Sequence, residues 1–219
     1  RQRDGYKYSD LGYYLFKEAL ERQYKKPLNE LVDEEFYEPL GANRTSYLPL
    51  NKFSKKEIVP SEKDDYYRNQ LLQGNVHDMG AAMLGGVGGH AGLFSNANDV
   101  AKIMQMYLQK GYYGGKRYLK SSTIEKFNKR YFSNEKVRRG LGFDKPQLNP
   151  KVKATCGCVS DESFGHSGFT GTYTWADPKS EIVYVFLSNR TYPTIDNRGL
   201  VKTNMRTKIQ KIIQNAMLD

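Results

Sequence analysis

The order of elements along the chain predicts an α+β fold, with helices first, an antiparallel hairpin next and a covering helix last. Apolar residues recur at helical spacing in several segments before residue 110. The Thr-, Tyr- and Trp-rich residues 170–176, the turn residues 177–180 and the apolar run 182–187 are typical of a β-hairpin. We expect a mainly helical lobe with long loops at 1–139, and the strands with the final helix at 140–219, within one domain.

Two helices are expected near the start of the chain. Ser9 or Asp10 can cap a helix over 10–22, and Pro27 suits the first turn of a second helix. The residues expected to face inward are Leu11, Tyr14 and Leu15 in the first helix and Leu28, Leu31, Val32 and Phe36 in the second. Residues 39–41, Pro-Leu-Gly, end the second helix.

A long excursion and a third helix follow. Residues 43–75 are polar and aperiodic, which predicts an irregular loop, and so long a loop is usually functional. After the glycine-rich residues 85–92, Ser95 is expected to cap an amphipathic helix that ends at Gly111. Its inward residues are predicted to be Val100, Ile103, Met104, Tyr107 and Leu108.

The hairpin and the last helix complete the predicted architecture. The strand 182–187 is apolar on both faces, which predicts a position inside a sheet that is covered on both sides. Two or three strands cannot cover both faces of a sheet, so we expect further strands from outside this chain. The last helix is expected over 200–218, with Met205, Ile209, Ile212, Ile213 and Ala216 as its stripe.

Composition excludes several classes of protein. The 219 residues suffice for a sizeable core, and the longest apolar run, 182–187, is too short to cross a membrane. The formal charge of +10 is spread over small Lys/Arg groups, for which solvated faces are the expected position. A nucleic-acid binder would rest on charge alone and is the least favoured function. Cys156 and Cys158 cannot join distant segments, so the chain is not a disulfide scaffold.

Two short segments carry candidate chemistry. Tyr8-Ser9-Asp10 precedes a helix, whose N-terminal field favours an ionised tyrosine. Gly165-His166-Ser167-Gly168 enters the first hairpin strand, where glycine would let a substrate carbonyl approach backbone N–H donors. Taken alone, one tyrosine and one histidine are more often packing residues than catalysts.

Together with the residues between them, these segments resemble the serine β-lactamases and penicillin-binding proteins, in the class C and esterase branch. Tyr8-Ser9-Asp10 is similar to the Tyr-x-Asn motif, and His166-Ser167-Gly168 to the His-Thr-Gly version of Lys-Thr-Gly. The matching segments follow the family's order across nearly the whole chain: Pro39-Leu40-Gly41 with Thr45, Gly92–Ser95 before Asp99, Leu141-Gly142-Phe143, Asp177-Pro178 and Ser188-Asn189-Arg190.

The resemblance implies a β-lactamase/transpeptidase-like fold and acyl transfer from a lactam, ester or D-alanyl amide. Tyr8 would be the general base or its relay, and His166 would position the substrate carboxylate or tune Tyr8. Asp10 would contact substrate in place of the usual Asn, adding a negative charge that disfavours anionic substrates. The Phe169 N–H would be an oxyanion donor. The substrate-binding set is Asp10, Ser167, Gly168, Phe169 and Thr172.

The family's nucleophile, in Ser-x-x-Lys, precedes the tyrosine motif, and only seven residues precede Tyr8 here. The sequence Ser133-Asn134-Glu135-Lys136 matches the pattern but follows Tyr8, so we interpret it as a coincidence. The first residue is Arg1 rather than Met. We therefore expect a C-terminal part of a serine hydrolase, inactive alone, whose partner is the missing N-terminal part.

Other patterns are weaker. Residues 86–91 match a loose dinucleotide-binding pattern, but no strand-like run precedes them, so a tight turn is favoured and no cofactor is expected. His77, Asp78, His90 and the cysteine pair lack zinc-motif spacing, so no metal is expected and the histidines should bond loop backbone.

The resemblance extends to bacterial relatives fused to a family-three glycoside hydrolase, which implies an extracytoplasmic, periplasmic or cell-envelope location. The principal alternative to the hydrolase is a non-catalytic module that binds peptidoglycan or another wall fragment. An acylating active-site probe would distinguish these two functions.

Overall fold

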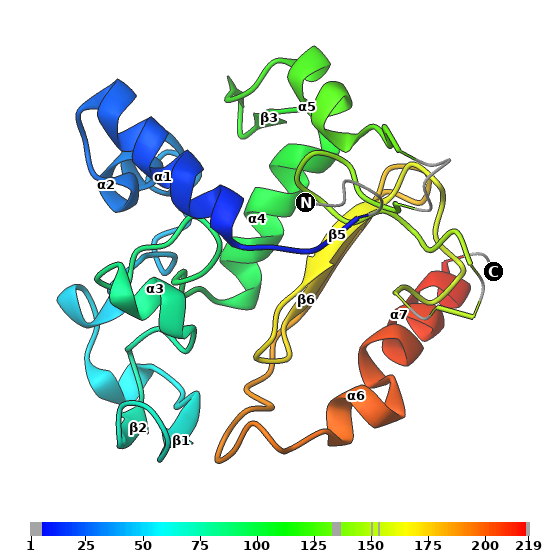
Figure 1. Cartoon of the computed structure of the whole chain (residues 1–219). Helices are drawn as coiled ribbons and strands as arrows, with labels where there is room; N and C mark the ends of the chain where they lie inside the picture. The colour runs from blue at the N-terminus through cyan, green and yellow to red at the C-terminus, as the bar shows by residue number, and fades with distance from the viewer. Residues whose placement is uncertain (1–5, 133–136, 150, 153, 218–219) are drawn as a thin grey trace. The chain divides into compact units, whose positions relative to one another are not determined.

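The computed structural model describes residues 6–132, 137–149, 151–152 and 154–217 (Figure 1). The chain divides into two compact units. The N-terminal unit comprises residues 8–100 and 188–198, and the sheet unit contains residues 101–187 and 199–217. The segment Ser133–Lys136, interpreted above as a coincidental motif, lies outside the described residues.

The N-terminal unit is built from short helices and one hairpin. Its elements are α1 (Leu11–Tyr24), α2 (Leu28–Val32), the π-helix η1 (Asp33–Tyr37), the 3₁₀ helices η2 (Pro49–Asn51) and η3 (Lys55–Glu57), β1 (Glu62–Asp64), β2 (Gln70–Leu72) and α3 (Met79–Met83). Helix α4 (Ala97–Leu108) begins in this unit and continues into the sheet unit.

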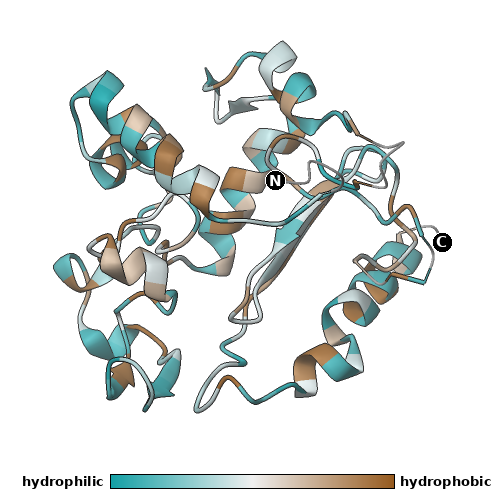
Figure 2. Ribbon diagram, viewed as in Figure 1, coloured by the Kyte–Doolittle hydropathy of each residue, from teal (hydrophilic) through white to brown (hydrophobic). Residues whose placement is uncertain are grey.

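The first helix forms where the sequence predicts it, but its predicted inward face is wrong. Leu11 and Leu15 are 63% and 72% exposed, and no residue of α1 is buried. Only Tyr14 of the predicted stripe is half-buried. In Figure 2 hydrophobic residues, in brown, alternate with hydrophilic ones along the ribbon of α1. Periodicity identifies an apolar stripe but not the surface that covers it, and the described residues do not bury this one.

The predicted second helix is confirmed as α2 continued by η1, with Leu28 buried and the rest of its stripe half-buried. By contrast, the predicted irregular loop 43–75 contains two 3₁₀ helices and the antiparallel hairpin β1–β2. This hairpin is too short for a period-two pattern to reveal it. Residues 188–198 add to it, since Lys63 N–H donates to Pro193 O at 2.9 Å and Thr191 Oγ1 to Ser61 O at 2.7 Å.

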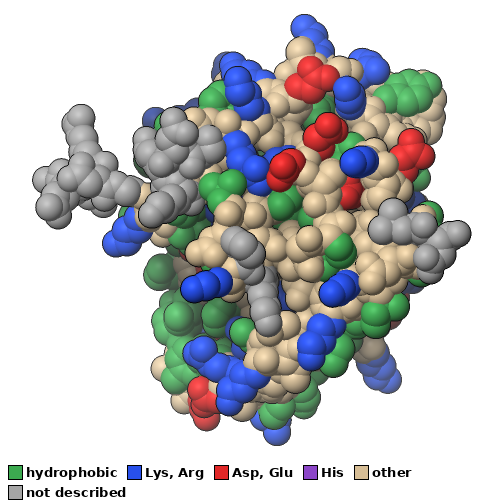
Figure 3. All heavy atoms as spheres, turned by 90° about the vertical axis from the view of Figure 1, so that its right-hand side faces the viewer, with side chains coloured by type: hydrophobic (Ala, Val, Ile, Leu, Met, Phe, Trp, Pro, Cys, Tyr) green, Lys and Arg blue, Asp and Glu red, His purple; other side chains and the backbone are tan. Residues whose placement is uncertain are grey.

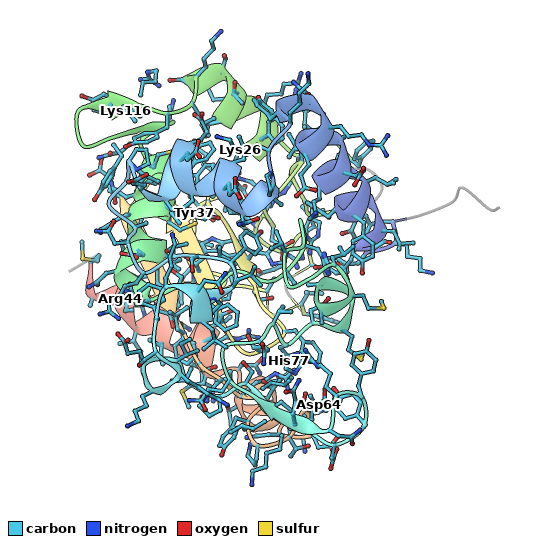
Figure 4. The ribbon with its side chains drawn as sticks, turned by 90° about the vertical axis from the view of Figure 1, so that its left-hand side faces the viewer. Lys26, Tyr37, Arg44, Asp64, His77 and Lys116 are labelled. Atoms are coloured by element: carbon cyan, nitrogen blue, oxygen red, sulfur yellow. A yellow bond between two sulfur atoms is a disulfide. The ribbon has the colours of Figure 1, made fainter. Side chains whose placement is uncertain are left out.

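Buried charges hold this hairpin in place. Glu62 and Asp64 are both buried, and Arg68 Nε donates to Asp64 Oδ2 at 3.0 Å. Figure 4 labels Asp64 and His77 in this part of the chain. Arg68 also donates to the carbonyls of Val76 and His77. His77 Nε2 lies 2.9 Å from Glu62 Oε2. Buried hydrogen bonds and charged pairs therefore order this part of residues 43–75, which was predicted to be an irregular loop.

Helix α4 ends as predicted, with Gly111 at φ 86°, but Ser95 does not cap it. The Asn96 side chain accepts from the Asp99 N–H at 2.9 Å, while the Ser95 hydroxyl lies 2.7 Å from Thr45 Oγ1. Because either Ser or Asn can cap a helix, sequence alone does not choose between neighbours. Met104 is buried as predicted.

The sheet unit has one three-stranded antiparallel sheet, in the order β5-β6-β7. Its elements besides α4 are β3 (Tyr112–Tyr113), β4 (Lys116–Arg117), α5 (Ser121–Asn128), β5 (Phe164–Ser167), β6 (Tyr173–Asp177), β7 (Ile182–Phe186), α6 (Gly199–Thr203) and α7 (Met205–Ala216). The predicted hairpin is confirmed as β6–β7, with Trp175 opposite Tyr184.

One face of this sheet carries the aromatic core. Tyr173, Trp175 and Tyr184 are buried, and Ile209 and Ile213 of α7 pack against them. On the other face the Phe164 ring lies 5.1 Å from that of Phe143. Among the described residues β7 is at the edge of the sheet, so its predicted position inside a covered sheet depends on strands from outside this chain and stays a prediction.

The last helix is broken where one helix was predicted. Asn204 has φ 51° and separates α6 from α7. Asn is among the few residues that adopt this left-handed conformation readily. The sequence is therefore compatible with a break at Asn204 but does not predict one. The inward face of α7 also differs from the predicted stripe: Ile212 is 69% exposed, whereas Gln210 and Gln214 are buried.

The cysteines bond to each other. Cys156 and Cys158 form a disulfide across two positions, which joins no distant segments. Gln210 of α7 accepts from the Cys156 N–H at 2.9 Å and from Tyr173 OH at 3.1 Å. The buried Gln210 therefore ties the disulfide loop to the sheet core.

Surface features bear on the excluded functions. Figure 3 shows Lys and Arg side chains scattered over the face it draws rather than gathered into one patch. None of the described helices combines the length and apolarity that crossing a bilayer requires.

Gly165 is expected to tolerate no side chain. A Cβ at this position would overlap the Thr174 carbonyl oxygen and press on Trp175 of the paired strand. Because backbone atoms cannot rotate away, Gly165→Ala should lower the free energy of unfolding by about 1–3 kcal/mol. Urea unfolding measures this change. Gly142→Ala is the control, since nothing lies within 4 Å of its Cβ position; equal losses in both variants would contradict the prediction.

Candidate active site

The predicted site residues are divided between the two units. Tyr8 and Asp10 belong to the N-terminal unit, and His166, Ser167, Gly168, Phe169 and Thr172 belong to the sheet unit.

The Tyr8-Ser9-Asp10 segment leads directly into α1. Tyr8 is 57% exposed, and Asp10 occupies the N-cap position without a side-chain capping bond. The Ser9 hydroxyl instead accepts from the Leu11 N–H at 3.4 Å. The N-cap residue Asp10 thus lies at the positive end of the α1 dipole, where negative charge is favoured.

Asp10 lies in a cluster that the sequence did not predict. Ligand atoms of Asp10, Asp78 and His90 all lie within 4.8 Å of one another. His90 Nε2 is 2.8 Å from Asp78 Oδ1, and the Tyr14 ring lies tilted against the imidazole, with centroids 4.7 Å apart. The His90 side chain is only 4% exposed. The Asp10 carboxylate therefore lies beside Asp78 and His90 rather than in solvent alone.

The prediction that the histidines bond loop backbone is wrong for His90. His90 pairs with Asp78, and His77 lies against Glu62. The signal in the sequence was weak, because an Asp before a small-residue helix and a His twelve positions later do not indicate contact. Asp78 also caps α3, since its Oδ1 accepts from the Ala81 N–H at the start of that helix.

Electrostatics keep Asp78 ionised. Burial acts to raise the pKa of this carboxyl, but the Ala81 N–H and His90 outweigh burial, so its pKa is below the ordinary value. Two carboxylates and an imidazole are donors that a divalent cation accepts, so these three residues could hold one. The His90–Asp78 hydrogen bond accounts for the same arrangement.

Family-like segments on the two sides of the glycine-rich stretch also contact each other. Thr45 Oγ1 lies 2.7 Å from Ser95 Oγ, and the Arg44 N–H donates to Asp99 Oδ2 at 2.7 Å. The glycine-rich stretch follows helix α3, not the strand that a dinucleotide-binding fingerprint requires. The Tyr47 hydroxyl contacts this glycine-rich stretch by donating a hydrogen bond to Gly88 O at 2.9 Å.

In the sheet unit, His166 is half-buried near the end of β5. Its Nδ1 is 2.9 Å from Ser167 O, and its Nε2 is 3.0 Å from Arg139 Nη1. Arg139 and Arg138 both bind the buried Asp144, at 2.9 and 2.6 Å. The expectation that small Lys/Arg groups lie on solvated faces is therefore wrong for this pair, and Arg139 is a site residue that the sequence analysis missed.

The strand ends in a tight turn after His166. The Gly168 N–H donates to Thr172 O at 2.9 Å, and the Gly171 N–H to Gly168 O at 3.1 Å. Ser167 and Phe169 are exposed at this turn, Phe169 at 64%. A Cβ at Gly168 would overlap the Thr172 hydroxyl, so a side chain at this position would force Thr172 to move. The role of the Phe169 N–H as an oxyanion donor stays a prediction.

Comparison with known proteins supports a single family. A family model described as Beta-lactamase matches residues 2–202. A protein of Escherichia coli K12 that is named as a D-alanyl-D-alanine carboxypeptidase is 35% identical over 201 residues, 86% of this chain and 46% of the relative. A Salmonella agona protein of the same name is 35% identical over 203 residues, 87% of this chain and 46% of the relative. The chain thus spans about half the length of these relatives.

Solved structures show the same fold at low sequence identity. A D-amino acid amidase from Ochrobactrum anthropi SV3 matches with a TM-score of 0.65 and 15% identity, over 97% of this chain and 58% of that chain. A penicillin-binding protein homologue from Caulobacter crescentus matches with a TM-score of 0.58 and 18% identity, over 84% and 52% of the respective chains.

Proposed function

The chain belongs to the β-lactamase family, and from that premise we propose that it is the C-terminal part of a serine hydrolase that catalyses acyl transfer. The observation that carries the proposal is the strand β5 with the turn that follows it. His166 is held near the end of the strand, and Gly168 and Gly171 form the tight turn through backbone hydrogen bonds. Such an edge suits a substrate carbonyl that must reach N–H donors.

The proposed reaction needs a serine from outside this chain. Its hydroxyl oxygen attacks the substrate carbonyl carbon, and Tyr8 accepts the hydroxyl proton. The bond to the leaving amine or alkoxide then breaks, the proton passes to that leaving group, and an acyl-enzyme remains for water to hydrolyse. Phe169 N–H would stabilise the oxyanion, and Asp10 would contact the substrate beside Tyr8.

The substrate class we favour is a D-alanyl peptide, with an envelope location for the protein. The supporting observation is the 35% identity to relatives named as D-alanyl-D-alanine carboxypeptidases. The Asp10 carboxylate adds negative charge beside Tyr8, so groups close to Asp10 in the bound substrate should be neutral or cationic.

We further propose that the remaining part of the longer protein covers the apolar face of α1 and pairs with β7. Leu11, Leu15 and Phe16 are 63%, 72% and 64% exposed. Strand β7 is at the edge of the described sheet although its residues are apolar. Edge strands with apolar faces normally pair or are covered, and the matched relatives are about twice as long as this chain.

The test is covalent labelling by a fluorescent acylating β-lactam, on this chain alone and on the longer protein that contains it. We expect labelling of the longer protein only, and loss of labelling when its upstream Ser-x-x-Lys serine is replaced by Ala. Labelling of the isolated chain would overturn the claim that it is inactive alone. Binding of wall fragments without labelling of either form would favour the non-catalytic module.

A further inference from the structure

A cavity of about 380 Å³ lies in the sheet unit, beside the start of β5 and the last turns of α4 and α5. Its apolar wall is formed by Tyr107, Leu108, Ile124, Phe164 and Pro178. Ile124 and Phe164 are buried, so core packing fixes the shape of this wall. Cavities of this volume that combine apolar walls with a few polar groups are the usual sites for small organic molecules.

Lys145 brings an amine to the wall of this cavity. The residue is 4% exposed, and its Nζ donates to Glu162 O at 2.7 Å and to Asn128 Oδ1 at 3.2 Å. All three residues line the cavity, so the amine lies at its surface. Asn128 Nδ2 donates to the same Glu162 carbonyl at 3.1 Å, which orients Oδ1 toward the lysine.

These contacts suit an unprotonated amine. An ammonium group has three N–H donors, whereas a neutral amine has two N–H donors and a lone pair. The two acceptors at Lys145 Nζ match the two donors of the neutral form. The lone pair then remains for a bond to a ligand.

Electrostatics favour the neutral form as well. Burial lowers the pKa of Lys145 to about 8, and the nearby Arg130 acts in the same direction. Glu162, Asp161 and Asp177 act to raise this pKa but do not outweigh burial. At pH 7.5 such an amine is roughly one quarter unprotonated, against about one part in a thousand for an ordinary lysine. The amine is therefore available as a nucleophile near neutral pH.

The other charged side chains that line the cavity lie close to opposite charges or to an aromatic ring. Lys110 Nζ lies 3.2 Å from Glu125 Oε1, and Arg130 Nη1 lies 3.7 Å from Asp161 Oδ1. The exposed Lys129 places its ammonium 5.7 Å from the centroid of the Tyr131 ring. Apolar walls and balanced charges together favour an uncharged ligand.

We propose that this cavity binds a small aromatic aldehyde and that the Lys145 amine captures it as an imine. The nitrogen forms a bond to the carbonyl carbon, and the carbonyl oxygen leaves as water with one amine hydrogen and one proton from solvent. The protonated imine keeps one N–H for Glu162 O, and the step needs no oxidant or reductant. The aldehyde ring would pack against Tyr107 and Phe164.

The test uses the wild-type chain with benzaldehyde and sodium cyanoborohydride at pH 7.5, and peptide mass spectrometry locates the trapped amine. Lys145 should react at least about tenfold faster than the exposed Lys151, because its unprotonated fraction is roughly 200 times that of an ordinary lysine, although a less basic amine is a weaker nucleophile. The rate at Lys145 should saturate as benzaldehyde increases. Labelling no faster than at Lys151, or a rate that stays linear in benzaldehyde, would overturn the proposal without any variant.

Leu108→Trp tests whether the cavity holds the aldehyde, because the larger side chain fills it. Labelling of Lys145 by benzaldehyde should fall roughly tenfold, whereas labelling by the much smaller formaldehyde should persist. Phe127→Trp is the control, since Phe127 is 51% exposed, belongs to α5 and does not line the cavity. Circular dichroism checks folding, and the smaller change Leu108→Phe replaces Leu108→Trp if the latter does not fold. A folded variant that reacts with benzaldehyde as the wild type does would show that the cavity is not the binding site.

Discussion

Replacing Tyr8 by Phe in the full-length protein is expected to lower the rate of acylation by about 10²–10⁴-fold, the usual contribution of a general base. The substitution removes one hydroxyl from a side chain that is 57% exposed, so the cost in folding stability should be small. The measurement is the rate of covalent labelling by an acylating probe, with unfolding recorded in parallel.

Tyr6→Phe is a close control for this variant. Tyr6 lies two residues earlier and is 52% exposed, so the chemical change and the solvent environment are nearly the same. Its labelling rate should match the wild type. If both variants label at the wild-type rate, Tyr8 is not the base, and the resemblance of residues 8–10 to the family motif would not extend to function.

Local chemistry explains which parts of the fold were predictable. The hairpin β6–β7 was expected because Thr-, Tyr- and Trp-rich residues flank a strong turn, and each of these signals acts within a few residues. The break at Asn204 was not expected, since Asn tolerates a left-handed backbone without requiring one. The inward face of α1 was wrong because the covering surface is a tertiary property.

The site shows the same division between local and tertiary information. The segments around Tyr8 and His166 could be identified from contiguous residues, and the family they indicate was confirmed. The pairs His90–Asp78 and His166–Arg139 join residues 12 and 27 positions apart. No spacing rule predicts such contacts, because intervening loops of variable shape set them.

Replacing Arg68 by Met is expected to lower the free energy of unfolding by about 3–5 kcal/mol, the usual cost of leaving one partner of a buried ion pair unpaired. Asp64 has no exposed side-chain area, and the Arg68 side chain is 14% exposed. The variant also abandons the carbonyls of Val76 and His77, to which Arg68 donates at 2.6 and 2.7 Å. Urea unfolding at neutral pH measures the loss.

Arg44→Met is the control for Arg68→Met, because it removes an exposed ion pair in the same unit instead of a buried one. Arg44 Nη1 lies 3.2 Å from Glu57 Oε1, with side chains 59% and 44% exposed. Such a pair contributes no more than about 1 kcal/mol, because water screens it and both side chains lose freedom. Equal losses in the two variants would show that burial of Asp64 does not matter.

The acid dependence of stability should change with Arg68 as well. Burial acts to raise the pKa of Asp64, but hydrogen bonds from the Tyr67 backbone and from Arg68 outweigh it, so the folded pKa is below the ordinary 3.8. A depressed carboxyl pKa stabilises the fold above the unfolded value, and this contribution disappears as pH falls through the folded value. Arg68→Met should therefore lose less stability than the wild type between about pH 5 and the folded pKa.

His77 adds a second acid-sensitive step at higher pH. Burial lowers the pKa of His77 below its ordinary 6.5, and this effect outweighs the attraction of Glu62. A base with a depressed pKa stabilises the fold above its unfolded value, so stability should fall as pH drops below about 6.5. His77→Gln should remove this step and leave the lower one that Asp64 controls. A wild-type stability that stays constant from pH 7 to pH 5 would contradict the assignment.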